Sequence, residues 1–283
     1  MLELDHPLKN DGGETEVIGS CDDLLCLFNL HQNHKKVALW NPSTRKHHKL
    51  PANPIAFPDI GRNRLTIAYG FGYDRVSDDY KVVRMIESLR EDLDSFDCEV
   101  LVYNLKLNSW RRIQDFPYYH RYSGYGMLAN GALHWVVFPT PGLDRPELIA
   151  AFDLGVEEHR LVPQPDYPGK NFDLNVEILG GWLCVICDYC RFGADTCVDI
   201  WVMKEFGGKE SWTRLFSVAQ PSSIREFKYV WTLVFSQSRG EVLLIQDGGR
   251  LLWYDFKMNT IKYTEIRGGG METNVCFGSH TPL

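Results

Sequence analysis

Long apolar runs, clusters of basic residues and helical periodicity are all missing from this sequence of 283 residues. No apolar stretch approaches the roughly 20 residues that a membrane-spanning helix needs. The first residues, Met-Leu-Glu-Leu-Asp-His-Pro, lack the positive charge and the apolar core of a secretory signal. We therefore expect a protein of the cytoplasm and/or the nucleus, with no membrane partner.

A basic surface is also missing. The chain carries 30 Lys and Arg residues against 37 Asp and Glu residues, which gives a formal net charge of −7, and its pI is near 5.7. Binding to the phosphates of a nucleic acid needs clustered Lys and Arg side chains. The charge balance therefore argues against a nucleic-acid partner.

Cysteine is too scarce for a disulfide scaffold, because the chain has only 8 and most of them lie in apolar, strand-like runs. Four have the C-x2-C-x2-C-x6-C spacing that is compatible with a zinc or iron–sulfur site: Cys184, Cys187, Cys190 and Cys197. On a strand, residues three apart point to opposite faces, so Cys184 and Cys187 are not expected to converge on one ion. We predict buried thiols, no metal and no cofactor.

Signatures of catalysis are equally sparse. Gly70-Phe71-Gly72 is followed by neither the third glycine nor the helical pattern of a dinucleotide site. No sequence pattern near His47, His48 or His134 supplies a nucleophile or a metal partner. The acidic run Glu91–Asp97 lacks the ordered spacing of a calcium loop. We therefore predict no catalytic residues, and a binding module rather than an enzyme.

What the sequence does contain is an internal repeat. Its unit is an apolar strand that ends in an aromatic residue and then Asn or Asp, followed by a polar turn and another short strand; the fourth copy lacks the Asn or Asp. The interval is close to the ~40–50 residues of one β-propeller blade. Five copies are present, with aligned aromatic residues Trp40, Tyr103, Phe152, Trp201 and Tyr254.

Each copy is preceded by another apolar strand, in most cases after a tight turn that contains Gly, Asn or Asp. These strands are expected at Leu24–Leu30, Tyr80–Ile86, Ala132–Phe138, Trp182–Cys187 and Glu241–Gln246. One further strand before each turn completes a unit of four antiparallel strands, and such units bury both faces by stacking radially. We predict an all-β propeller in one domain over residues 1–283, with a sixth blade built from Leu2–Leu4 and Thr273–Phe277.

Long and short connections alternate along the predicted strands. Because the strands alternate in direction, the long connections emerge on one face, and long loops on a rigid scaffold are the usual place for recognition. These loops carry the aromatic and Arg residues that commonly anchor protein interfaces. The predicted contact residues for a target protein are Tyr118, Tyr119, Arg121, Tyr122, Tyr167, Tyr189, Arg191 and Phe192. The alternative is that their side chains pack only against neighbouring loops.

Several longer strings occur in a characteristic order. They are Ile18–Cys26, Leu39–Lys46 with Leu50-Pro51, Tyr69–Asp74 with Asp78–Arg84, Val102–Leu105 with Ser109-Trp110-Arg111, and Asn130–Trp135. This order resembles the F-box-associated, kelch-like region of plant F-box proteins. The resemblance is most specific over residues 18–135 and continues more loosely through Gly180–Leu183 to the end of the chain.

The resemblance implies the substrate receptor of an SCF-type, cullin-RING ubiquitin ligase. In such a protein the F-box recruits a Skp-type adaptor and the cullin, while the associated domain binds the target. We expect the F-box itself to be missing, since residue 18 already begins the associated region. Two alternatives stay open: a propeller hydrolase or oxidase with a site in its central channel, and an interaction scaffold with no role in degradation.

Overall fold

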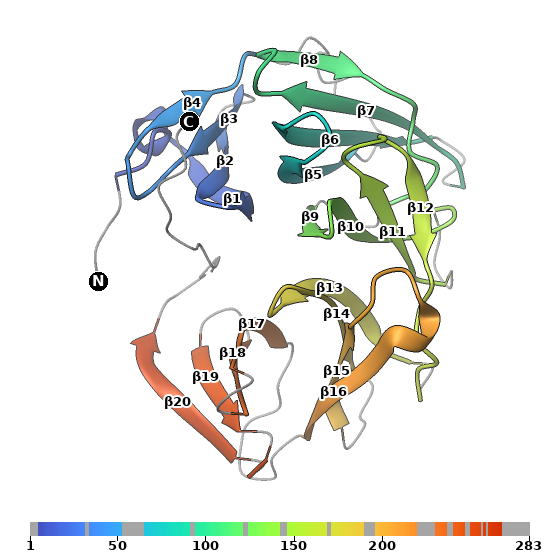
Figure 1. Cartoon of the computed structure of the whole chain (residues 1–283). Coiled ribbons are helices and arrows are strands. Elements are labelled where there is room, and N and C mark those ends of the chain that lie inside the picture. The colour runs from blue at the N-terminus through green and yellow to red at the C-terminus, as the bar shows by residue number, and fades with distance from the viewer. Residues whose placement is uncertain are drawn as a thin grey trace. The chain divides into compact units, whose positions relative to one another are not determined.

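The structure is a computed structural model, and nearly all of its regular structure is strand (Figure 1). It describes residues 5–31, 34–52, 65–90, 94–120, 124–141, 146–168, 171–189, 196–219, 230–236, 240–246, 250–255, 257–258 and 260–267. The helices in these residues are the short 3-10 turns η1 (Lys9–Asp11) and η3 (Lys209–Ser211). None of the helices in these ranges has the length and apolar character to cross a membrane.

The chain divides between Leu161 and Val162 into two compact units. The first unit begins with a four-stranded antiparallel sheet in the order β1 (Glu14–Cys21), β2 (Leu24–His31), β3 (His34–Trp40) and β4 (His47–Lys49). An eight-stranded sheet follows, in the order β12-β11-β10-β9-β5-β6-β7-β8.

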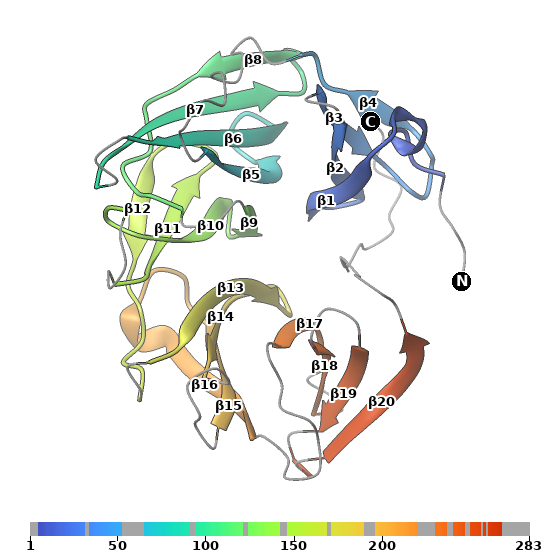
Figure 2. The same cartoon turned by 180° about the vertical axis from the view of Figure 1, so that it is seen from behind.

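The eight-stranded sheet consists of two sets of four strands. One set is β5 (Leu65–Asp74), β6 (Asp79–Leu89), β7 (Phe96–Asn104) and β8 (Ser109–Arg112); the other is β9 (Gly124–Ala129), β10 (Ala132–Val137), β11 (Leu148–Asp153) and β12 (His159–Val162). The pairs β5–β6, β6–β7, β7–β8, β9–β10 and β10–β11 are antiparallel. The sets are joined by a short parallel pairing of β5 with β9, which lie side by side in Figure 1 and Figure 2.

The second unit repeats the same sheet twice. The first set is β13 (Asp173–Leu179), β14 (Trp182–Asp188), β15 (Thr196–Met203) and β16 (Trp212–Ala219). The second is β17 (Val230–Ser236), β18 (Glu241–Gln246), β19 (Arg250–Asp255) and β20 (Thr260–Arg267). Each is a four-stranded sheet in sequence order, with antiparallel pairs.

The predicted repeat is visible in every set. The five aligned aromatic residues all lie on the third strand of a set, namely β3, β7, β11, β15 and β19. In the fourth copy the register differs from our alignment: Leu183 of β14 pairs with Met203, whereas its counterparts Leu133 and Val242 pair with Phe152 and Tyr254. Met203 therefore occupies the aromatic position there, and Trp201 lies earlier on the strand. The predicted sixth set, Leu2–Leu4 and Thr273–Phe277, lies outside the described residues.

The Asn or Asp of the repeat starts a tight turn. Its side-chain oxygen accepts backbone N–H groups two and three residues ahead, an interaction that short amide and acid side chains favour. Three copies show it: Asn41 with Ser43 and Thr44 at 3.0 and 2.9 Å, Asp153 with Gly155 and Val156 at 2.9 and 3.2 Å, and Asp255 with Lys257 and Met258 at 2.9 Å each.

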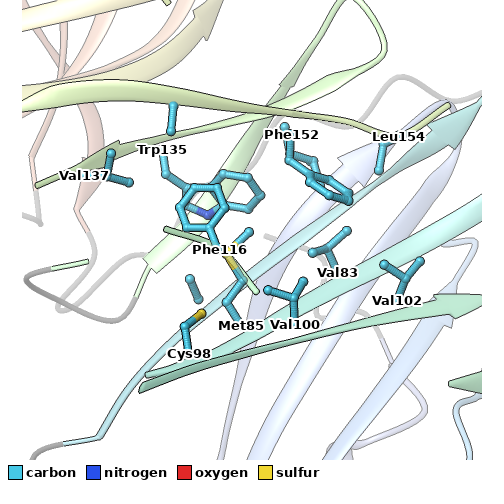
Figure 3. Packing of buried hydrophobic residues seen from close by; sticks show 13 residues of the cluster. Val83, Met85, Cys98, Val100, Val102, Phe116, Trp135, Val137, Phe152 and Leu154 are labelled. Atoms are coloured by element: carbon cyan, nitrogen blue, oxygen red, sulfur yellow. The ribbon is translucent and has the colours of Figure 1, made fainter. Parts of the chain in front are cut away.

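A hydrophobic core lies between sets β5–β8 and β9–β12. Figure 3 shows Met85, Phe116 and Trp135 among its buried side chains. Gly126 of β9 makes room for the Trp135 indole, because a Cβ there would lie 2.4 Å from Trp135 Cζ2. Another core joins β1–β4 to β5–β8, and in the second unit a core joins β13–β16 to β17–β20. The stacking of four-stranded sets through apolar faces is the arrangement that the repeat predicts within each unit.

Candidate functional site

The two ends of sets β5–β8 and β9–β12 carry different connections. We call the end with the turns at residues 75–78, 105–108, 130–131 and 154–158 the short-turn end, and the opposite end the long-loop end. The long-loop end holds the connections from β6 to β7, from β8 to β9 and from β10 to β11. This arrangement follows from the alternating strand directions, and it places residues 113–120 of the β8–β9 connection at the predicted binding face.

Residues 113–120 are fastened to both sets. The Ile113 amide donates to the Val100 carbonyl on β7 at 3.0 Å. Tyr119 and Phe138, just beyond β10, exchange two backbone hydrogen bonds of 2.9 and 2.8 Å. A connection held on both sides is a pre-organised element, because fewer backbone conformations are lost when it binds a partner.

A buried carboxylate provides the third fastening. Glu87, near the end of β6, is 1% exposed at its side chain, and His120 is 3% exposed. The Glu87 carboxylate accepts the His120 backbone N–H at 2.9 Å, and its other oxygen lies 2.5 Å from the ring Nδ1 of the same residue. Both contacts involve one residue, so the carboxylate fixes the position of the backbone and the orientation of the ring together.

Aromatic rings surround this contact, and Phe116 lies at their centre. The His120 ring stacks on Phe116 with centroids 5.5 Å apart. Trp135 and His159 meet Phe116 edge-on at 6.3 and 5.7 Å, and Tyr118 does so at 5.5 Å. Edge-to-face and offset contacts at these distances are favourable for aromatic pairs. We call Phe116, Tyr118, His120, Trp135 and His159 the aromatic cluster.

The predicted contact residues of this connection have different surroundings. Tyr118 is half-buried at the edge of the aromatic cluster. Tyr119 is 9% exposed, and its ring packs against Phe96 with centroids 5.4 Å apart. Four of the eight predicted contact residues lie outside the described residues: Arg121, Tyr122, Arg191 and Phe192. The structure therefore brings Tyr118 and Tyr119 together and turns the Tyr119 ring inward, while their contact with a target stays a prediction.

The other two predicted residues lie in the second unit. Tyr167 is half-buried, with its ring 4.8 Å from Phe172 and 6.3 Å from Trp201. Tyr189 is buried, packs on Phe172 at 5.4 Å, and donates its hydroxyl to Asp199 Oδ2 at 3.4 Å. Phe172 thus brings both tyrosines into one cluster, and their role in binding also stays a prediction.

Sequence reasoning missed the buried polar residues at the ends of second strands. Asn29 of β2 donates its side-chain amide to the Gly12 and Glu14 carbonyls at 2.8 and 3.2 Å, and so anchors the entry to β1. Glu87 lies near the end of β6, at the long-loop end, and anchors His120. A polar residue in the largely apolar strand β2 is the signal that points to Asn29, because burying an unpaired polar group is costly. β6 carries several charged residues, so its sequence does not single out Glu87.

The short-turn end is held by charges. The Lys81 ammonium of β6, 4% exposed, lies 2.8 Å from Asp74 Oδ2 and 2.8 Å from Glu157 Oε1, and donates to the Leu154 carbonyl at 2.6 Å. Arg111 also pairs with Glu157. Burial alone would raise the pKa of both carboxyls, but the hydrogen bonds they accept outweigh it and lower each pKa. For Lys81, burial opposes the charged form, yet its two carboxylate partners raise its pKa.

Burial also shifts the pKa values of titratable groups elsewhere in the two units. Burial raises the pKa of Glu177 on β13 to about 8 and lowers that of His134 on β10 to about 4. Burial, followed by the charge of Glu177, raises the pKa of Cys184, which packs in the core of the second unit. Within the described residues, no group of three or more His, Cys, Asp or Glu side chains is placed to hold a metal ion. Cys190 and the side chain of Cys197 lie outside them.

Comparisons with known proteins agree on one family. The F-box associated beta propeller domain matches residues 6–281. The F-box protein CPR1 of Arabidopsis thaliana is 40% identical over 283 residues, which cover 93% of this chain and 67% of that protein. The F-box protein At4g22390 of the same plant is 36% identical, over 92% of this chain and 67% of that protein. The F-box/kelch-repeat protein At3g23880 is 31% identical, over 72% and 52% respectively.

Likeness to solved structures is weaker. A chain from a study of two prolyl endopeptidases is 9% identical with a TM-score of 0.47, over 90% of this chain and 43% of that chain. The structure of YjhT is 13% identical with a TM-score of 0.44, over 87% and 82%. Values this low carry no argument about function. The family match and the four-stranded antiparallel sheets together confirm the predicted all-β propeller class.

Proposed function

This chain belongs to the family of F-box associated beta propeller domains, and on that premise we propose that it is the substrate-recognition domain of an SCF-type, cullin-RING E3 ubiquitin ligase. It binds a target protein at the long-loop end and presents it for ubiquitination and degradation. The domain itself is non-catalytic, and the covalent chemistry belongs to partner subunits. A Skp-type adaptor and the cullin are bound by an F-box segment and not by these residues.

The observation that carries the binding site is the fastened β8–β9 connection. Residues 113–120 are held to β6, β7 and the end of β10, and they present Tyr118 beside buried rings. Protein interfaces are anchored by aromatic side chains on rigid supports, which lose little conformational entropy on binding. The acidic net charge of −7 fits a protein target better than a nucleic acid. The complex acts in the cytoplasm and/or the nucleus.

Affinity capture from plant extract, with quantitative mass spectrometry, tests the binding site. The baits are the domain, a variant with Tyr118→Ala and Tyr167→Ala, and a control with Leu107→Ala, whose side chain is 70% exposed in a turn at the short-turn end. We expect proteins that the domain and the control retain, and that the tyrosine variant loses by tenfold or more. Equal retention by all three baits contradicts a site at the long-loop end.

A second experiment separates a degradation receptor from a scaffold. The domain is fused behind an F-box segment and expressed in plant cells, and the half-life of each captured protein is followed with and without a proteasome inhibitor. A receptor shortens the half-life in an inhibitor-sensitive way, and a domain without the F-box does not. A scaffold leaves the half-life unchanged in both cases, which would overturn the degradation part of the proposal.

A further inference from the structure

One face of β6 carries two apolar residues, Val83 and Met85, between two charged residues, Lys81 and Glu87. Val83 and Met85 lie in the core shared with set β9–β12. Lys81 and Glu87 stand two residues before and two residues after them, and alternate residues of a strand share a face. Lys81 meets the turn after β11, and Glu87 meets His120. Lys81 and Glu87 therefore both contact groups beyond their own set of strands.

The contact of Glu87 joins residues that are distant in the sequence, but it acts on a single residue, His120. Glu87 and His120 are 33 positions apart in the sequence, yet one carboxylate binds the backbone N–H and lies within hydrogen-bond distance of the ring nitrogen of the same residue. Hydrogen bonds to charged groups are stronger than those between neutral groups. Because the carboxylate is 1% exposed, water offers no ready replacement if His120 moves away. The contact therefore favours one position of His120.

His120 directly precedes the predicted contact residues Arg121 and Tyr122 in the sequence. Its neighbour Tyr119 is paired through the backbone with Phe138 on the other side. Tyr118 precedes this pair of fastenings, and Arg121 and Tyr122 follow it directly in the sequence. A shift of His120 would move the residues on both sides.

We propose that Glu87 is a positioning residue for target binding: without touching the target, it holds the β8–β9 connection in the shape that the target recognises. This inference rests on the proposed function, since it gives a role to the same binding face. We therefore expect loss of the Glu87 carboxylate to weaken the affinity for the target more than it lowers the stability of the fold. The residue acts through His120 and the rings stacked beside it.

Hydrogen exchange in the purified domain tests the positioning without any target. The variants are Glu87→Met, which keeps the length of the side chain and removes the acceptor, and Glu87→Gln, whose amide oxygen still accepts the His120 N–H. The control is Lys106→Met, the same kind of replacement at a residue whose side chain is 55% exposed at the short-turn end. Thermal unfolding of each variant reports global stability.

We expect Glu87→Met to speed exchange of the Tyr119 and His120 amides by about tenfold or more, which is the scale of losing a charged hydrogen bond. Amides in the middle of β7 should be unaffected. Glu87→Gln should restore most of the protection, and Lys106→Met should change none of it. Equal exchange in Glu87→Met and Lys106→Met would overturn the proposal. If Glu87→Met fails to fold, His120→Phe, which keeps the stack on Phe116, replaces it and should speed exchange of the Tyr119 amide.

The unmodified domain and the three variants are then used as baits for affinity capture from plant extract. The amount of each protein that the unmodified domain retains is compared among the variants. We expect Glu87→Met to lose retention by about tenfold while Glu87→Gln and Lys106→Met keep it. Faster exchange with unchanged retention overturns the positioning role. Retention of nothing by the unmodified domain counts against the proposed function, whereas the exchange result is read independently of it.

Discussion

The two ends of β6 show two ways of holding a sheet together. At the short-turn end, Lys81 is enclosed by Asp74, the last residue of β5, and Glu157, in the turn between β11 and β12. At the long-loop end, Glu87 holds His120, which belongs to the long connection between β8 and β9. The ion pairs of Lys81 join strands and turns of the sheet to one another, so they stabilise the fold. The Glu87 contact fixes part of a long connection, and long connections on a rigid scaffold are the usual place for recognition.

Turn contacts and buried contacts differ in their range along the sequence. The turns of the short-turn end begin with contacts to residues two and three positions ahead, as at Asp153. The buried contacts at both ends of β6 join residues far apart in the sequence, as in Lys81 with Glu157 and Glu87 with His120. Turn contacts depend on neighbouring residues, whereas distant contacts depend on the whole fold.

The largest effect is expected from Lys81→Met. The change leaves the Asp74 and Glu157 carboxylates without their shared cation, and Asp74 is 2% exposed at its side chain. Breaking a buried ion pair from one side costs about 3 kcal/mol or more, because a charge stays behind without a partner. Urea unfolding of the purified domain measures it. A loss below about 1 kcal/mol would show that the apolar core alone holds this end.

A smaller effect with a defined pH dependence is expected from Glu157→Gln. The folded pKa of Glu157 is lowered from the usual 4.5, so its ionised form stabilises the fold above that value, and this contribution is lost as the pH falls through the folded pKa. Because the variant loses charge-assisted hydrogen bonds from Lys81 and Arg111, we expect it to be less stable than the parent by about 1 kcal/mol at pH 7. The difference should shrink below pH ~4. A pH-independent difference would mean that shape, not charge, decides at this position.

The sequence alone predicts the structures that depend on neighbouring residues, namely the strands and the tight turns. The repeat of an aromatic residue and then Asn or Asp indicates the third strands and their turns, because an Asx residue directs the backbone two residues ahead. Periodicity also predicts the second strands and β17 (Val230–Ser236). The alignment is wrong only where Met203 replaces the aromatic residue, since composition then favours the neighbouring Trp201.

The contacts between residues far apart in the chain are not predictable from one sequence. Lys81 and Glu87 lie in a strand that mixes charged and apolar residues, and their partners are found only once sets β5–β8 and β9–β12 are packed together. The inward orientation of the Tyr119 ring likewise depends on Phe96, which comes from another strand. Loop position indicates that an aromatic residue is near the binding face. It does not decide whether the ring points outward.

A further test addresses two tryptophan tethers, each between the fourth strand of a set and the connection that precedes that set. Trp110 Nε1 donates to the Pro51 carbonyl at 3.1 Å, and Trp212 Nε1 donates to the Pro163 carbonyl at 2.7 Å. Trp110→Phe and Trp212→Phe keep a ring and remove the donor, so each should cost about 1 kcal/mol in urea unfolding. Similar costs would indicate one repeated tether in both units. A change confined to one variant would show that the two contacts are not equivalent.

The smallest effect is expected from Lys106→Met, and it sharpens the comparison within the short-turn end itself. Lys106 pairs with Asp78 at 2.8 Å, the same distance that separates Lys81 from Asp74, but its side chain is 55% exposed against 4% for Lys81. Water and salt screen an exposed pair, so we expect no measurable shift of the urea midpoint, at low salt or at high salt. The distance is the same in the two pairs, so they differ in burial and in the further partners of Lys81, which are Glu157 and the Leu154 carbonyl. A shift as large as that of Lys81→Met would therefore contradict the view that burial, rather than ion pairing as such, holds this end together.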